Sequence, residues 1–202
     1  MPTGLPVTIN GCSHHLRAGI TVLEALHQVG IKVPDLCYDP RISPSGNCRL
    51  RLVEIETRER PLAACQTLLS EGMRIWTHTP PLEAGRKTIL KMLARRYPQE
   101  ALAKWPDKPF HQWLRHYGVM AGAPEKPVSV DDSHPYIRVD MSRCIDCTRC
   151  VRICAQVQGQ FVWGMRNRGD ETAIIAAIPA YLWAQAPASV AEHVQTRAPQ
   201  GH

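Results

Sequence analysis

The chain has 202 residues, of which 44% are hydrophobic and 21% are charged, a balance that is typical of a soluble globular protein and excludes wholesale disorder. Its formal net charge of +6 is spread along the sequence, whereas a nucleic-acid binder would concentrate Lys and Arg in one run. No basic stretch leads into an apolar segment at the N-terminus, so we expect no secretory signal and a cytoplasmic protein. Cytoplasmic thiols are kept reduced, and the eight cysteines therefore need an explanation other than disulfides.

A hairpin and a helix are expected at the start of the chain. Asn10-Gly11 is a strong hairpin signal between the segments 5–10 and 13–17. Thr21 can cap a helix whose apolar residues recur at helical spacing as far as Val29.

Loop composition follows over residues 36–47, and short strands are expected over 49–56, 62–68 and 73–77. Together these elements predict a compact mixed α/β module that ends near Thr79-Pro80-Pro81.

The residues after this module have a different character. Segment 86–97 sets apolar residues among Arg and Lys and predicts an amphipathic helix, and segment 110–117 predicts a second, shorter one. Residues 121–135 have linker composition, and a short strand is expected over 136–139. The basic residues of the first helix are expected to form a solvated face: Arg86, Lys87, Lys91, Arg95 and Arg96.

The cysteines fall into two groups that are separated by a long cysteine-free stretch. The first group is Cys12, Cys37, Cys48 and Cys65, and the second is Cys144, Cys147, Cys150 and Cys154. This distribution predicts two cysteine-bearing modules that are joined by a connector.

The second group has the spacing Cys-x2-Cys-x2-Cys-x3-Cys, which is the most specific motif in the sequence. Three thiolates at this spacing can hold three corners of a [4Fe–4S] cluster, and in the bacterial ferredoxin run the fourth cysteine ligates another cluster. Zinc sites more often use two separated pairs of ligands. We expect a helix over 151–157 that carries Cys154 away from the first three thiols. Ala155 stands where the ferredoxin run has proline, and no second run is present.

The first group reads Cys37-x10-Cys48-x2-Arg51-x13-Cys65 and suits a [2Fe–2S] site, which needs four ligands. Arg51 stands where the third of four cysteines is expected, and its guanidinium stays protonated and cannot ligate iron. Three ordinary buried cysteines are the alternative interpretation. Cys12 is expected to be an incidental surface thiol.

The residues of both groups resemble a known family. Residues 5–81 resemble the N-terminal [2Fe–2S] domain that is shared by the large subunit of respiratory complex I, hydrogenase diaphorase subunits and the α subunit of NAD-dependent formate dehydrogenase. The likeness is specific in Leu52-Val53-Glu54-Ile55 and the three cysteines around it. Residues 134–170 closely resemble the formate dehydrogenase α chain, above all over Cys144–Trp163.

This resemblance implies an α+β chain with a ferredoxin-like (β-grasp) [2Fe–2S] module over 1–81, a helical connector over 82–133, a partial bacterial-ferredoxin-like [4Fe–4S] module over 134–174 and a divergent tail over 175–202. It implies electron transfer between a pterin-metal subunit that oxidises formate and a flavin subunit that reduces NAD. The implied metal ligands are Cys37, Cys48, Cys65, Cys144, Cys147, Cys150 and Cys154. Residues 173–191 carry no charge, but their prolines argue against a membrane span.

The chain also departs from the family pattern. Besides Arg51 and the missing second ferredoxin run, it lacks the one-histidine, three-cysteine ligand set that complex I relatives carry in the connector, and it lacks the pterin-binding region. Formate turnover by this chain alone is therefore not expected. Two functions remain open: an iron–sulfur electron-transfer fragment, or a cluster-poor structural or interaction subunit, the latter including a non-functional gene fragment.

The tail is predicted to be out of frame with its ancestral gene. When the third base of one codon is joined to the first two of the next, four residue pairs can spell Cys codons in the spacing of the missing ferredoxin run, and Ala198–Pro199 can spell the proline that follows it. The four pairs are Pro187–Ala188, Val190–Ala191, His193–Val194 and Arg197–Ala198. Sequencing the coding DNA should find these codons with a dehydrogenase-like frame downstream. Their absence would leave a genuine divergent tail, which is the alternative.

Overall fold

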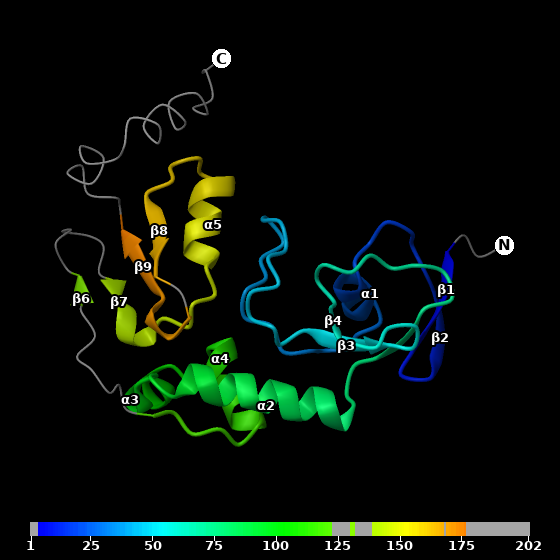
Figure 1. Ribbon diagram of the computed structural model, residues 1–202, viewed down its shortest axis with the longest axis horizontal. Coiled ribbons are helices and arrows are strands. Elements are labelled where there is room, and N and C mark those ends of the chain that lie inside the picture. The colour runs from blue at the N-terminus through cyan, green and yellow to red at the C-terminus, as the bar shows by residue number, and fades with distance from the viewer. Residues whose placement is uncertain (1–3, 123–129, 132–138, 168, 177–202) are drawn as a thin grey trace, which may run out of the picture. The chain divides into compact units, whose positions relative to one another are not determined.

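The computed structural model describes residues 4–122, 130–131, 139–167 and 169–176 (Figure 1). The described residues as far as Arg149 form one compact unit, and those from Cys150 onward form a second. The residue pairs that carry the predicted out-of-frame codons lie within 177–202, outside the described residues.

The N-terminal module is a five-stranded sheet in the order β2-β1-β5-β3-β4. Its strands are β1 (Leu5–Ile9), β2 (Cys12–Leu16), β3 (Leu52–Ile55), β4 (Leu62–Ala63) and β5 (Arg74–Trp76). β1 runs parallel to β5, and the other neighbouring strands are antiparallel. This is the ferredoxin-like α+β module that the sequence predicts.

The local signals at the start of the chain are confirmed. Asn10 and Gly11 take the left-handed φ values of 50° and 85° that a tight two-residue hairpin turn needs. Thr21 caps α1 (Val22–Gln28), and its backbone N–H donates in return to the Glu24 carboxylate at 2.6 Å. The apolar face of α1 packs with the sheet into one buried core.

β3 and β4 are much shorter than the strands expected over 49–56 and 62–68, and β5 is one residue shorter at each end than the strand expected over 73–77. Arg49 has a left-handed φ of 51°, so the extended backbone of β3 begins only at Leu52. β4 ends at Ala63, because the Thr67 N–H donates to the Ala63 carbonyl at 3.1 Å and the chain turns there.

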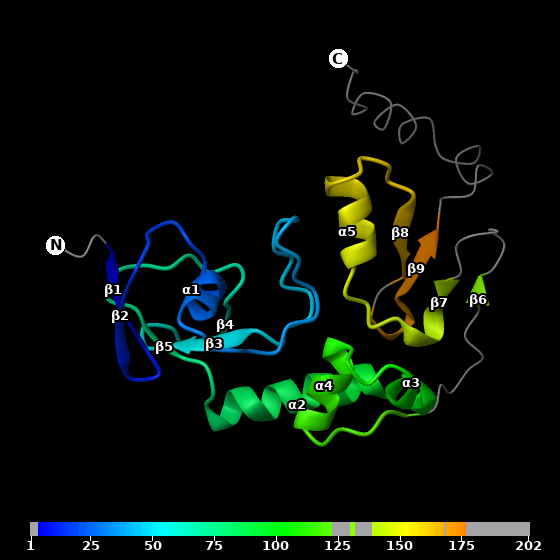
Figure 2. The same ribbon diagram turned by 180° about the vertical axis from the view of Figure 1, so that it is seen from behind.

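Three helices form the connector (Figure 2), and their buried side chains pack with Leu36 and Leu50 into a second core. α2 (Pro80–Ala94) begins six residues before the expected start, since Thr79 caps it and prolines are tolerated in a first helical turn. α4 (Pro109–His116) is where the sequence predicts it, whereas α3 (Gln99–Lys104) was not expected. The buried residues of this second core are Leu36, Leu50, Leu90, Ala94, Tyr97, Ala101, Phe110, Leu114 and Val119.

The remaining elements are short. β6 (Val130–Asp131) pairs with β7 (Val139–Asp140), and the single-turn helix η1 (Met141–Arg143) follows. In the second unit, β8 (Trp163–Arg166) pairs antiparallel with β9 (Ala173–Ala176), with the turn η2 (Gly169–Glu171) between them.

The helix expected over 151–157 is present as α5 (Arg149–Gln156), which begins two residues earlier. The strand expected over 136–139 is seen only from Val139, and residues 136–138 lie outside the described residues. Across the described ranges, every helix is too short or too polar to cross a membrane.

Candidate metal centres

The first candidate site lies on the loop between α1 and β3 and on the turn after β4. Cys37 and Cys65 are buried, and Cys48 is half-buried. The Cys48 N–H donates to the Cys37 Sγ at 3.5 Å. Gly46 has a left-handed φ of 67°, and a Cβ there would collide with the Gln66 side chain beside Cys65. The left-handed φ therefore favours glycine at this point of the loop, and any other residue would also have to displace the Gln66 side chain.

Arg51 lies in the interior of this site. Its side chain is only 2% exposed, and none of its three guanidinium nitrogens has a hydrogen-bond partner. Its Nη2 lies 3.6 Å from Asp35 Oδ1, and its guanidinium carbon is 4.8 Å from the centre of the Tyr38 ring. The Arg51 carbonyl accepts from the Ala64 N–H at 2.9 Å, which sets residue 51 beside the turn that carries Cys65.

Hydrogen bonding, burial and charge interactions shift the pKa values of the three thiols. A hydrogen bond from the Cys48 thiol lowers the pKa of Cys37 to about 5, and Arg51 contributes in the same direction. The same interaction and burial raise the pKa of Cys48. Burial raises the pKa of Cys65, and the positive charge of Arg51 opposes that rise. Cys48 thus contacts Cys37, and the charge of Arg51 acts on Cys37 and Cys65.

These residues do not fit a [2Fe–2S] cluster with four protein ligands. A guanidinium is always protonated and offers no lone pair to iron. Its nitrogens are buried without a hydrogen-bond partner, at the position of the motif where the fourth ligand is expected. Cys12 cannot replace it, because Cys12 is an exposed residue at the start of β2, at the hairpin.

The second candidate site begins on the loop that follows η1. Asp146 and Thr148 take left-handed φ values of 50° and 57°, and the Asp146 N–H donates to the Cys144 Sγ at 3.4 Å. Successive turns of this kind point backbone N–H groups into a concavity that suits anions and iron–sulfur clusters. Burial raises the pKa of Cys144 to about 12, and nearby Cys147 adds to the rise. The thiols and the loop backbone at Cys144–Thr148 are of the kind that iron–sulfur ligation uses.

The two remaining cysteines of the motif lie on α5. Cys150 is exposed, and Cys154, one helical turn later, is 2% exposed. In the part of the chain that the structure describes, no three His, Cys, Asp or Glu side chains come together as a metal-binding group.

One long-range polar contact was missed by sequence reasoning. Asn47, next to Cys48, donates from Nδ2 to the Oγ1 of Thr148 at 2.9 Å, and both residues belong to the first compact unit. Thr148 is only 3% exposed. A separation of 101 residues leaves no local signal for such a pair.

The expected solvated face is wrong for Arg86. Its side chain is 1% exposed, and it donates to two backbone carbonyls and to Glu83. His111 is also buried, between the Tyr97 hydroxyl at 2.7 Å and the Trp105 carbonyl at 2.6 Å. Both ring nitrogens of His111 therefore have protein partners, and its role is structural.

The fold and the two cysteine motifs define an iron–sulfur protein built from ferredoxin-like modules. Residues 3–80 match the family model of a 2Fe-2S iron-sulfur cluster binding domain, and residues 134–188 match that of the NADH-quinone oxidoreductase subunit 3 ferredoxin-like domain.

Named relatives agree with these matches. The chain is 35% identical over 173 residues to the NADH-ubiquinone oxidoreductase 75 kDa subunit of Reclinomonas americana, covering 83% of this chain and 25% of that protein. It is 33% identical over 171 residues to the mitochondrial NADH dehydrogenase (ubiquinone) iron-sulfur protein 1 of Solanum tuberosum, covering 82% and 23%. The crystal structure of an NAD+-reducing [NiFe]-hydrogenase in the H2-reduced state matches 87% of this chain and 76% of that chain, with a TM-score of 0.77 and 28% identity.

The chain belongs to the iron–sulfur family of the complex I 75 kDa subunits and their hydrogenase relatives. It spans about a quarter of the length of the curated relatives that it matches. The family expected from the sequence is confirmed at the level of the complex I and hydrogenase iron–sulfur subunits.

Proposed function

We propose that this chain is the iron–sulfur electron-transfer part of a cytoplasmic, NAD-linked oxidoreductase complex of the formate dehydrogenase type. Cys144, Cys147 and Cys150 would hold a [4Fe–4S] cluster, and such a cluster accepts and releases single electrons when it is bound. The N-terminal module would keep its fold without a normal binuclear cluster, because Arg51 occupies the interior of its site.

The observation that carries the proposal is the loop from Cys144 to Thr148. Left-handed residues alternate with cysteines there, and an N–H group already points at the first thiol. This loop lies in the segment that matches the ferredoxin-like family model. A cysteine with a purely structural role does not require left-handed neighbours that direct N–H groups toward its sulfur.

The formate dehydrogenase assignment rests on the likeness of residues 134–170 to that family's α chain. It makes a pterin-metal subunit that oxidises formate the electron donor and a flavin subunit that reduces NAD the acceptor. The relatives support the NAD-linked part, since their names include an NADH-ubiquinone oxidoreductase and an NAD+-reducing hydrogenase.

A cluster-poor structural or interaction subunit is the second candidate, and the buried Arg51 favours it for the N-terminal module. Anaerobic expression followed by iron and sulfide analysis and EPR separates the two. We expect about four irons per chain, or about three if the cluster loses its least protected corner, and no binuclear signal. A chain that is folded by circular dichroism but free of iron would favour the second candidate.

A further inference from the structure

Arg86, on helix α2, binds the backbone on both sides of residue 51. Its Nε donates to the Leu50 carbonyl at 3.1 Å, and its Nη2 donates to the Leu52 carbonyl at 2.9 Å. Its side chain is only 1% exposed, so these bonds are shielded from water. A single guanidinium therefore spans the segment that carries Arg51.

The strand register explains why a side chain is needed there. The Arg51 carbonyl bonds toward β4, so the carbonyls of Leu50 and Leu52 point to the opposite edge of the strand. On that edge β3 pairs with β5 only at Glu54 and Ile55, because the chain then leaves β5 and enters α2 at Pro80. Arg86 supplies the donors that a longer β5 would have given.

Two further residues hold the guanidinium in place. Its Nη1 donates to Glu83 Oε1 at 2.7 Å, and the Tyr117 hydroxyl donates to Glu83 Oε2 at 2.6 Å. Burial and the contact with Glu83 raise the pKa of Tyr117 to about 12, which keeps that hydroxyl a donor. The contacts thus run from the end of α4 through α2 to the segment around residue 51.

We propose that Arg86 is a positioning residue of the N-terminal cysteine site, which is therefore completed by the connector rather than by the ferredoxin-like module alone. The match to the [2Fe–2S] family model ends at residue 80, where α2 begins, so Arg86 lies outside the matched domain. Arg86 fixes residue 51 and, through the bond from the Ala64 N–H to the Arg51 carbonyl, the turn that carries Cys65. This role holds whichever group the site binds.

Hydrogen exchange of the full chain, read by mass spectrometry, tests the proposal. We expect Arg86→Met to speed exchange over residues 48–52 and 61–66 by about tenfold, and to leave the β1–β2 hairpin unchanged. Arg86→Lys keeps the charge and one donor group, and its exchange should be about threefold faster than in the unaltered chain, between that chain and Arg86→Met. The alkylation rate of buried Cys65 should rise from the unaltered chain to Arg86→Lys and again to Arg86→Met. The rate for exposed Cys12 in the same molecule serves as the reference.

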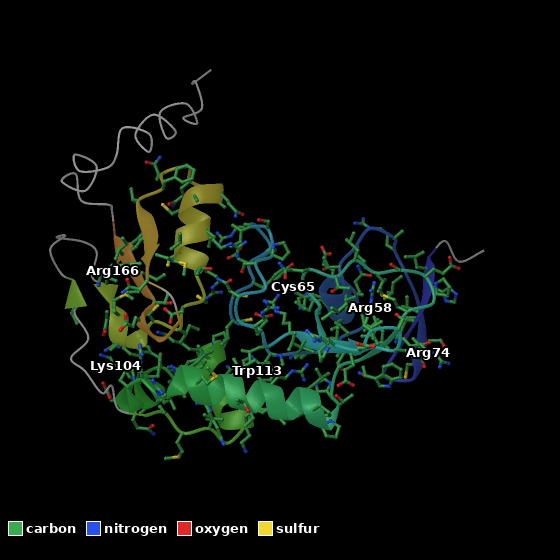
Figure 3. The ribbon with its side chains drawn as sticks, in the orientation of Figure 1. Arg58, Cys65, Arg74, Lys104, Trp113 and Arg166 are labelled. Atoms are coloured by element: carbon green, nitrogen blue, oxygen red, sulfur yellow. The ribbon has the colours of Figure 1, made fainter. Side chains whose placement is uncertain are left out.

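Arg74→Met is the matched control. Arg74 is more than half exposed, its ion pair with Glu56 at 3.2 Å is solvated, and it lies on the strand beside the hairpin, away from Cys65 (Figure 3). It should leave all of these rates unchanged. Equal acceleration of the hairpin and the site would reduce Arg86 to a general stabilising residue and overturn the proposal. If Arg86→Met does not fold, Arg86→Lys decides: exchange indistinguishable from the unaltered chain would also overturn it.

Discussion

Replacing Arg51 with cysteine is expected to give the N-terminal module a red-brown chromophore and a reduced-state EPR signal that the unaltered module lacks. The change supplies the fourth thiolate and removes a buried cation whose nitrogens have no hydrogen-bond partner. Each unsatisfied buried donor costs about 1–3 kcal/mol, so the exchange is not expected to destabilise the module.

The measurement is cleanest in a Cys147→Ala background, where the second site should contribute no iron. There we expect about two irons per chain with Arg51→Cys and close to none without it. Arg51→Ser removes the same guanidinium without adding a thiolate and should leave the module colourless. A full, stable binuclear cluster in the unaltered chain would show that the three thiols suffice, and the interpretation of Arg51 would be wrong.

Cys147→Ala should abolish the [4Fe–4S] signal, whereas Cys154→Ala should leave most of it. Cys147 lies in the middle of the predicted ligand run, so its loss leaves two of the three thiolates. Cys154 is buried a helical turn beyond Cys150 on α5 and is predicted to point away from the same cluster. Iron content should fall from about four per chain to near zero in the first variant only.

Cys12→Ala is the control for this pair, because Cys12 is exposed on β2 and belongs to neither motif. Thermal unfolding of the Cys154→Ala chain checks that emptying its buried position has not unfolded the module. Equal loss of iron in Cys147→Ala and Cys154→Ala would make Cys154 a ligand of the same cluster and contradict this assignment.

Features that depend on a few neighbouring residues could be predicted from the sequence. The Asn10-Gly11 turn, the Thr21 cap and the helix around Cys154 are of this kind, because turn and cap geometry is set by residues within one helical turn. The cysteine spacing likewise predicted the two iron–sulfur modules, and the family matches confirm them.

The tertiary structure alone decided the surroundings of the two buried arginines. From the sequence, Arg51 was interpreted as replacing a cysteine ligand, and Arg86 was predicted to lie on a solvated face. Arg51 is buried beside Tyr38 and Asp35, and Arg86 is buried because β5 ends early and leaves two carbonyls without a strand partner. Where a charged side chain ends depends on which backbone groups distant segments leave unpaired, and no local pattern records that.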